Sequence, residues 1–204
     1  MKLAMLGGTY DPIHLGHIML GQKFVRSEGL DKVLIVPTKV PPHKAASTTP
    51  AELRLAMCRL AAEYAGDEFE ASDIELRRDG LSYSYYTVLE LLEKYPENSE
   101  LYLITGADMF MTLETWHEFD KMNKLVTFCT VPRGDITFAQ LSAHARELGE
   151  RTRCGRYIIA EEPLMDVSST VIRAAVAAGE PIGKYVPPAI AEYIKKNGLY
   201  KPKE

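Results

Sequence analysis

Short apolar runs separated by helical segments are the feature that most restricts how this chain can fold. Lys2–Leu6, Lys32–Pro37 and Glu100–Thr105 are almost continuously apolar, and each ends at or next to a glycine or proline. Strands of this kind are buried on both faces, which is typical of a parallel sheet covered by helices. We therefore predict an α/β fold, a Rossmann-like doubly wound parallel sheet of about five to six strands with helices on both faces.

The expected elements follow one another without a long linker. Strands are expected at Lys2–Leu6, Lys32–Pro37, Phe69–Leu76, Glu100–Thr105, Leu125–Val131 and Arg156–Ala160. Helices are expected at Leu15–Glu28, Pro50–Tyr64, Ser82–Lys94, Phe138–Gly149, Ser168–Ala178 and Pro187–Lys196. Because no Pro/Gly/Ser-rich segment divides the 204 residues, we predict one domain over residues 1–204, with a C-terminal helical portion at about residues 165–200.

Such a sheet also predicts where a ligand binds. Ligands of doubly wound sheets lie beyond the carboxyl ends of the strands, near the point where the strand order reverses. The loops Gly7–His17, Pro37–Lys44 and Gly106–Trp116 follow the first, second and fourth expected strands. We expect these three loops to line one crevice.

Composition excludes some classes of protein. The formal net charge is -4 and the pI is about 5.8, which argues against a protein that coats nucleic acid. No apolar run is long enough to span a membrane, and no signal peptide precedes the first expected strand. Cys58, Cys129 and Cys154 have no metal-site spacing, so we expect reduced thiols and a cytoplasmic protein.

The first loop, GGTYDPIHLGH, has the composition of a phosphate site. Gly7 and Gly8 let the backbone turn and approach a ligand, and Thr9 adds a hydroxyl. His14 and His17 are three residues apart at the start of an expected helix, so they share a face beside free N–H groups that attract anions. The dinucleotide fingerprint GxGxxG and the P-loop pattern GxxxxGK[ST] are both absent.

A second anion-binding candidate lies near the C-terminus in the segment VSSTVIR. Ser168 or Ser169 is a suitable helix N-cap, and Arg173 lies one turn further along. By itself this segment reads as an ordinary capped helix with a surface arginine. Combined with the first loop, it is a candidate second set of phosphate ligands.

Other polar residues follow the remaining expected strands. The loop KVPPHK carries His43 and Lys44 next to two stiffening prolines. Asp108 follows the fourth strand in the sequence GAD, where its carboxylate could accept hydrogen bonds from ribose hydroxyls. Trp116 is the single tryptophan, and its flat ring could either fill the core or stack on a ligand ring.

These motifs together resemble the nucleotidyltransferase superfamily with the HxGH motif. Within it the chain is most similar to the bacterial nicotinate-nucleotide adenylyltransferases, over essentially its whole length. PPHK, the segment Asp73–Thr87 (DIELRRDGLSYSYYT), GAD and SSTVIR match motifs of that family. Two stretches depart from it, because Phe119 stands where a second tryptophan is frequent and VPRGD (131–135) replaces an RPG arrangement. Arg133 in that stretch remains a weak candidate for a phosphate contact.

The resemblance implies a reaction and assigns roles to residues. ATP and nicotinate mononucleotide would give nicotinic acid adenine dinucleotide and pyrophosphate, by direct transfer without a covalent enzyme intermediate and with Mg²⁺ accompanying ATP. Expected catalytic residues are His14, His17, Lys44 and Arg173. Expected ATP-binding residues are Gly7, Gly8, Thr9, His14, His17, Ser168, Ser169, Thr170 and Arg173. Expected substrate-binding residues are Tyr10, Asp11, Lys44, Thr87, Asp108 and Trp116, and no dedicated metal site is expected.

Two alternatives stay open at this stage. A related adenylyltransferase could use another phosphorylated acceptor, such as nicotinamide mononucleotide (NMN) or phosphopantetheine. A non-catalytic nucleotide sensor on the same fold is the alternative of a different class. The expected partners are small molecules rather than nucleic acid or membrane, and a homo-oligomer is compatible with the sequence.

Overall fold

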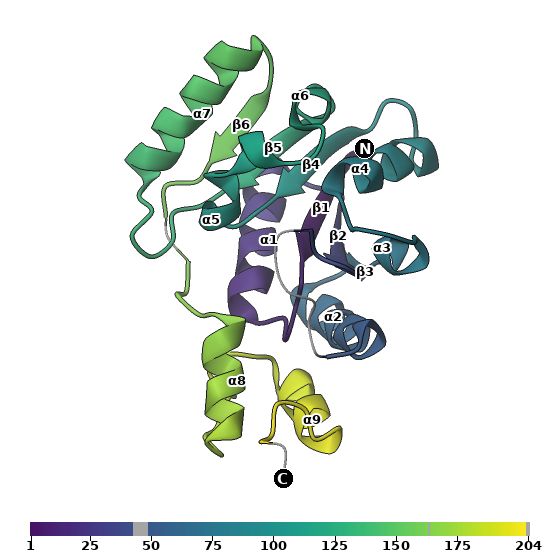
Figure 1. Cartoon of the computed structure of the whole chain (residues 1–204), viewed down its shortest axis with the longest axis vertical. Coiled ribbons are helices and arrows are strands. Elements are labelled where there is room, and N and C mark those ends of the chain that lie inside the picture. The colour runs from purple at the N-terminus through teal and green to yellow at the C-terminus, as the bar shows by residue number, and fades with distance from the viewer. Residues whose placement is uncertain (43–48, 163, 203–204) are drawn as a thin grey trace.

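A computed structural model, which describes residues 1–42, 49–162 and 164–202, contains one parallel sheet covered by helices (Figure 1). The sheet has six strands in the order β3-β2-β1-β4-β5-β6. The strands are β1 Lys2–Gly8, β2 Lys32–Pro37, β3 Phe69–Ala71, β4 Glu100–Ile104, β5 Val126–Thr130 and β6 Arg156–Ile159, and all pair in parallel. This is the predicted doubly wound topology, and the strand order reverses between β1 and β4.

Helices cover both faces of the sheet and extend beyond one end of it. They are α1 Leu15–Glu28, α2 Ala51–Ala65, α3 Ile74–Arg77, α4 Ser84–Lys94, α5 Ala107–Phe110, α6 Phe119–Met122, α7 Phe138–Thr152, α8 Ser169–Ala177 and α9 Pro188–Lys196, with a 3₁₀ turn η1 at Leu113–Thr115. Residues of α1, α2, α8 and α9 belong to one hydrophobic core, and residues of α4, α5, α6 and α7 belong to the other.

Alternation within each strand feeds these two cores. On β1, Ala4 and Leu6 join the core with α1 and α2, whereas Leu3 and Met5 join the core with α4 and α7. β2 repeats this pattern along its length. Burial on both faces explains why these strands are continuously apolar in the sequence.

The segment Phe69–Leu76, predicted as one strand, is wrong beyond its first half. β3 ends at Ala71, and Ile74–Arg77 forms the short helix α3. The amide of Ser72 still donates to the carbonyl of Ile35 at 2.9 Å, but Asp73 then begins the helical turn. Burial continues past the bend, because Ile74 packs in the core although it belongs to a helix, and this apolar position made the segment resemble a longer strand.

The backbone turn after β1 lies later than predicted. β1 continues through Gly7 and Gly8, and the left-handed residue is Tyr10, with φ 52°. Gly8 instead serves close packing: a Cβ there would lie 2.8 Å from the Tyr10 ring. The glycine pair is therefore a requirement of space rather than of backbone conformation.

The C-terminal helices are fastened to the start of α1. Ile172 on α8 and Ile190 on α9 are fully buried in the core that contains Ile18 of α1. The amide of Leu15 donates to the carbonyl of Tyr185 at 2.8 Å. The end of the chain thereby holds the loop between β1 and α1.

Candidate nucleotide-binding site

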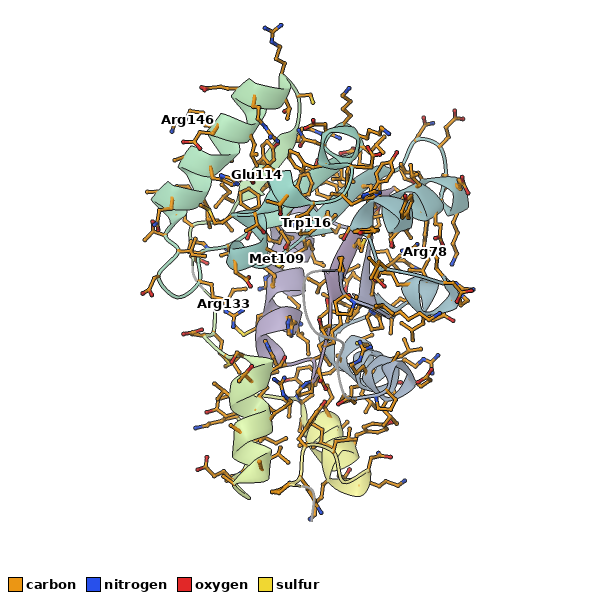
Figure 2. All side chains as sticks on the ribbon, in the orientation of Figure 1. Arg78, Met109, Glu114, Trp116, Arg133 and Arg146 are labelled. Carbon is orange, nitrogen blue, oxygen red and sulfur yellow. The ribbon has the colours of Figure 1, made fainter. Side chains whose placement is uncertain are left out.

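Two adjoining cavities open at the carboxyl ends of β1 and β4, where the strand order reverses. The larger has a volume of about 760 Å³ and the smaller of about 140 Å³. Both are lined by Gly7, Gly8, Thr9, Thr105 and Met109. Figure 2 labels Met109 between Trp116, which lines the smaller cavity, and Arg133, which lines the larger. The two cavities thus share a wall made by the strand ends.

The larger cavity, called the cleft below, brings the two predicted phosphate motifs together. From the first loop it is lined by Gly7, Gly8, Thr9, Tyr10, Asp11, His14, Gly16 and His17. From the C-terminal motif it is lined by Ser168, Ser169, Thr170 and Arg173. These segments are far apart in sequence, so the fold creates their proximity.

His14 and His17 stack at the N-terminus of α1, with ring centroids 3.7 Å apart. The backbone N–H of His14 donates to Nδ1 of His17 at 3.3 Å, which places the proton of a neutral His17 ring on Nε2. His14 Nδ1 is buried without a hydrogen-bond partner among the described residues. Two imidazoles therefore lie where helix N–H groups already favour an anion.

Burial and the nearby Arg133 guanidinium lower the pKa of His14 to about 3. The side chain is only 3% exposed, which is why desolvation is the larger effect. His14 is accordingly neutral at physiological pH in the free protein. A neutral imidazole has one N–H donor and one acceptor nitrogen, so His14 can bind a ligand by a hydrogen bond without carrying a charge.

Three side chains from distant parts of the sequence hold the first loop, two through its backbone and one through the side chain of Asp11. Arg54 of α2 donates to the carbonyl of Thr9 at 2.6 Å. Arg173 of α8 donates to the carbonyl of Asp11 at 2.7 Å, and the hydroxyl of Tyr200 donates to Asp11 Oδ1 at 2.7 Å. Each contact satisfies a loop acceptor that no strand or helix pairs.

Space around Gly16 is needed for the protein itself. A Cβ there would lie 3.0 Å from Val167 and 3.2 Å from His14 Nδ1. The segment before α8 therefore packs directly over the start of α1. Arg133 reinforces this contact, because its guanidinium donates to the carbonyl of Val167 at 2.6 Å and lies 3.6 Å from Asp166.

The smaller cavity, called the ring cavity below, is lined by aromatic and polar side chains. Trp116, Tyr83 and Tyr85 supply aromatic surface, and Ser84 lies at the first turn of α4. Trp116 packs against the core with α4 and α7, and its indole N–H is buried without a partner in the described part of the chain. An aromatic pocket at a helix N-terminus suits a flat ring that carries an anionic group.

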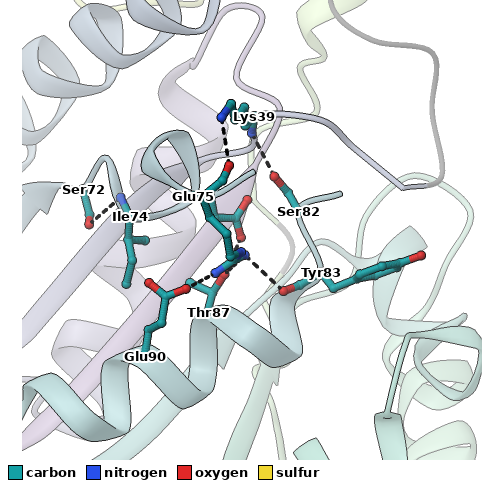
Figure 3. A network of polar contacts seen from close by, with 9 residues as sticks. Lys39, Ser72, Ile74, Glu75, Ser82, Tyr83, Thr87 and Glu90 are labelled. Atoms are coloured by element: carbon teal, nitrogen blue, oxygen red, sulfur yellow. Dashed lines mark hydrogen bonds and ion pairs between the residues drawn. The ribbon is translucent and has the colours of Figure 1, made fainter. Parts of the chain in front are cut away.

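Thr87 does not line the ring cavity, which corrects its predicted direct contact with a substrate. Its side chain is 0% exposed, and its hydroxyl donates to Glu75 Oε1 at 2.8 Å and accepts from Arg78 at 2.9 Å (Figure 3). Thr87 is fully buried among Glu75, Arg78 and the core side of α4. It supports the wall of the ring cavity from behind.

The side chain of Tyr10 is likewise buried rather than presented to a ligand. It is 2% exposed, belongs to the core and donates to the carbonyl of Leu6 at 2.7 Å. Its ring meets that of His17 edge-to-face, with centroids 5.0 Å apart. Tyr10 therefore shapes the first loop, and only its backbone is available to a ligand.

The remaining predicted residues are separated by the fold. Asp108 is exposed and lines the cleft, whereas Trp116 lines the ring cavity. Phe119, which stands where the resembled family frequently has a second tryptophan, is buried in the core. His43 and Lys44 lie outside the described residues, so their predicted role stays a prediction.

Sequence patterns missed several residues of the two cavities. Thr105 and Met109 flank the GAD motif and line both cavities, and Glu75 and His117 line the ring cavity. No sequence pattern indicated Glu75: it lies between Ile74 and Leu76, at a polar position of the segment DIELRR, and only the structure shows that it is buried. An acidic residue at such a position is rarely buried without a specific reason.

Among residues 1–42, 49–162 and 164–202, no group of three or more His, Cys, Asp or Glu side chains could hold a metal ion. Within that same part of the chain, no helix has both the length and the apolar character to cross a membrane.

Comparison with known proteins agrees with this geometry. The model of the cytidylyltransferase-like family matches residues 5–175. A probable nicotinate-nucleotide adenylyltransferase of Symbiobacterium thermophilum is 38% identical over 200 residues, which cover 98% of this chain and 95% of that protein. One of Exiguobacterium sibiricum is 36% identical, over 98% of this chain and 99% of that protein.

A solved structure has the same fold at lower sequence similarity. Plasmodium falciparum nicotinic acid mononucleotide adenylyltransferase, in complex with NaAD, superposes with a TM-score of 0.79 at 19% identity. The match covers 98% of this chain and 97% of that one. At this identity the comparison establishes the fold.

Proposed function

The chain belongs to the cytidylyltransferase-like family of nucleotidyltransferases, and we propose that it joins ATP to nicotinate mononucleotide to give nicotinic acid adenine dinucleotide and pyrophosphate. The observation that carries this proposal is the pair of adjoining cavities. One is a cleft lined by both phosphate motifs, and the other is an aromatic pocket, and they share the wall at Gly7–Thr9. In a dinucleotide product, the half derived from ATP would occupy the cleft and the pyridine ring would occupy the aromatic pocket.

The nucleophile in this reaction is the phosphate of the mononucleotide. A phosphate monoester is mostly dianionic at neutral pH, because its second pKa is about 6. No general base is therefore required. This fits a cleft in which His14 is kept neutral by burial and no residue of the described part is arranged as an activated nucleophile.

The protein's task is to align two anions and to neutralise charge on the leaving pyrophosphate. His17 at the N-terminus of α1 and Arg173 on α8 both line the cleft. In this proposal His14 and His17 contact the α- and β-phosphates, and Ser168–Arg173 holds the β- and γ-phosphates. Lys44 is assigned to the reacting phosphate by its sequence motif alone.

Magnesium would accompany ATP. Mg²⁺ takes oxygen ligands and at phosphates relies on few protein groups. The carboxylates of Asp11 and Asp108 line the cleft, so oxygen donors suited to Mg²⁺ and its bound waters are present. When bound, the ion would neutralise charge on the phosphate oxygens.

The acceptor ring is assigned to the ring cavity. Trp116 offers the stacking surface, and the start of α4 at Ser84 directs N–H groups toward an anionic ring substituent. This favours a pyridine mononucleotide over phosphopantetheine, which carries no ring. NMN is the second candidate acceptor, because the same cavity accommodates an amide substituent.

Pyrophosphate release from ATP tests the proposal directly. The purified chain is expected to release pyrophosphate with nicotinate mononucleotide and Mg²⁺, and to do so faster than with NMN or phosphopantetheine. A chain that binds ATP but releases no pyrophosphate with any of the three acceptors would be a nucleotide sensor, and the proposal would be wrong.

A further inference from the structure

Glu75 is a buried acid in the wall of the ring cavity that the proposed reaction does not use. It lies on the short helix α3, its side chain is only 3% exposed, and it lines the ring cavity together with Trp116 and Ser84. Isolated buried carboxyl groups are costly unless every oxygen is paired or the group is neutral. We therefore expect each oxygen of the Glu75 carboxyl to have a hydrogen-bond partner in at least one state of the protein.

Among the described residues, one hydrogen bond of ordinary geometry reaches the Glu75 carboxyl, and the Ser82 hydroxyl is close enough to favour its ionised form. Oε1 accepts the Thr87 hydroxyl at 2.8 Å (Figure 3). Oε2 is buried and has no hydrogen-bond partner among the described residues. Solvent does not reach this atom, so the described residues leave one hydrogen-bonding position at the ring cavity unmet.

The arrangement around Glu75 keeps Arg78 from pairing with it. Arg78 donates to Thr87 and forms an ion pair with Glu90. Thr87 in turn spends its single hydroxyl proton on Glu75. Glu75 thus meets the arginine charge only through a hydroxyl, and its second oxygen stays available.

We propose that Glu75 determines acceptor specificity by meeting the ring substituent at Oε2, as a donor to the carboxylate of nicotinate when protonated and as an acceptor from the amide of nicotinamide when ionised. This inference rests on the proposed function and deepens it. Oε2 is covered in the free protein. The contact therefore requires that binding of the ring shift the side chains of the cavity wall enough to reach this atom. Protonated Glu75 thereby favours the carboxylate of nicotinate, and ionised Glu75 favours the amide of nicotinamide.

The surroundings place this switch in the physiological range. Burial raises the pKa of Glu75 to about 7, against the lowering effects of the Thr87 hydroxyl, Arg78 and the Ser82 hydroxyl. The other titratable groups that act on it are Glu90 on α4 and the buried phenol of Tyr10. A bound nicotinate carboxylate, being a like charge, would raise the pKa of Glu75 further.

A pH profile of acceptor preference tests the proposal. The measured quantity is kcat/KM for nicotinate mononucleotide divided by kcat/KM for NMN, since titration of the phosphate common to both acceptors cancels in this ratio. The ratio is expected to fall about tenfold or more between about pH 6 and pH 8.5, as the free enzyme loses the Glu75 proton. In Glu75→Gln, whose amide donates at every pH, the ratio is expected to be independent of pH.

A matched control and two contrary outcomes complete this experiment. Glu93→Gln removes an exposed carboxylate on α4 that does not line the ring cavity, and it is expected to keep the wild-type profile. A flat ratio in the wild type, or an unchanged slope in Glu75→Gln, would overturn the proposal. Absence of turnover with either acceptor would instead contradict the proposed function.

A second measurement needs no variant. Nicotinate mononucleotide binding to the wild-type protein near pH 8 is expected to take up a proton, seen as a binding heat that changes with the ionisation enthalpy of the buffer. The infrared band of a protonated carboxyl group should grow on binding, because the like charge favours the neutral acid. A buffer-independent heat with no such band would overturn the proposal even if Glu75→Gln did not fold.

Discussion

The hydroxyl of Ser169 donates to the carbonyl of Pro12 at 2.8 Å, which joins two segments 157 residues apart in the chain. Arg173 repeats the connection one turn later by donating to the carbonyl of Asp11. The two phosphate motifs are therefore fastened to each other before any ligand binds. Such preorganisation lowers the cost of ordering the cleft around a triphosphate.

Ser169→Ala should weaken both stability and ATP use. It leaves the Pro12 carbonyl unpaired, so the free energy of unfolding is expected to fall by about 1 kcal/mol. The KM for ATP should rise several-fold, because the second motif is no longer held against the first. Thr137→Ala removes the N-cap of α7, outside both cavities, at a similar cost of about 1 kcal/mol. If both variants change KM equally, the Ser169 contact has no role specific to ATP.

His17→Ala should reduce turnover while the protein stays folded. Loss of a group that stabilises the developing charge costs about 10²–10⁴-fold in kcat. Steady-state pyrophosphate release and circular dichroism give the two readouts. His144→Ala is the control, because His144 lies on α7 and lines neither cavity. Near-normal turnover of His17→Ala would remove His17 from the mechanism.

The strands could be predicted from the sequence because burial of both faces leaves a mark in each short segment, a run of apolar residues. Nearly continuous apolar runs such as Lys32–Pro37 are typical wherever both faces of a strand are buried, and β1, β2 and β4 follow that rule. Short helices carry too few residues to show a period. α5 and α6, each four residues long, were therefore not predicted, and α3 was read as strand.

The site was less predictable because side-chain direction is a property of the assembled fold. Ser84 and Thr87 are both small hydroxyl residues on α4, yet one faces the ring cavity and the other faces Glu75. Sequence motifs located the segment but not the direction. Contacts such as Tyr200 with Asp11 join distant segments, so no local pattern could record them.

Two buried titratable groups should make opposite contributions to stability versus pH. Burial lowers the pKa of His14 from 6.5 to about 3, so below pH 6.5 the unfolded chain takes up a proton that the folded chain does not. Its contribution to stability is lost as pH falls. Burial raises the pKa of Glu75 from 4.5 to about 7, so above pH 4.5 the unfolded chain has lost a proton that the folded chain keeps. Its contribution is lost as pH rises.

Between pH 4.5 and 6.5 these effects oppose each other at about 1.4 kcal/mol per pH unit each. Relative to wild type, Glu75→Gln is therefore expected to gain stability with rising pH across this window, and His14→Gln to lose it. Urea unfolding at several pH values measures both differences. Curves for the two variants that run parallel to the wild type would show that neither group titrates differently on folding.

Tyr200→Phe tests whether the end of the chain positions the first loop. Tyr200 has a left-handed backbone, φ 63°, which is unfavourable for a non-glycine residue and is offset here by the hydrogen bond from its hydroxyl to Asp11. Loss of a hydrogen bond to a charged group should cost about 1.5–3 kcal/mol of stability. We also expect a several-fold higher KM for ATP with a smaller change in kcat, because Asp11 lines the cleft.

Two comparisons separate positioning by Tyr200 from a general loss of stability. Tyr64→Phe alters an exposed phenol on α2, 55% accessible, and should change neither quantity. In a double-mutant cycle with Asp11→Asn, a coupling energy of about 1 kcal/mol or more is expected both in unfolding and in ATP binding, since the paired groups are in contact. Coupling in unfolding but none in ATP binding would mean that the contact only anchors the terminus, and that the cleft keeps its shape without it.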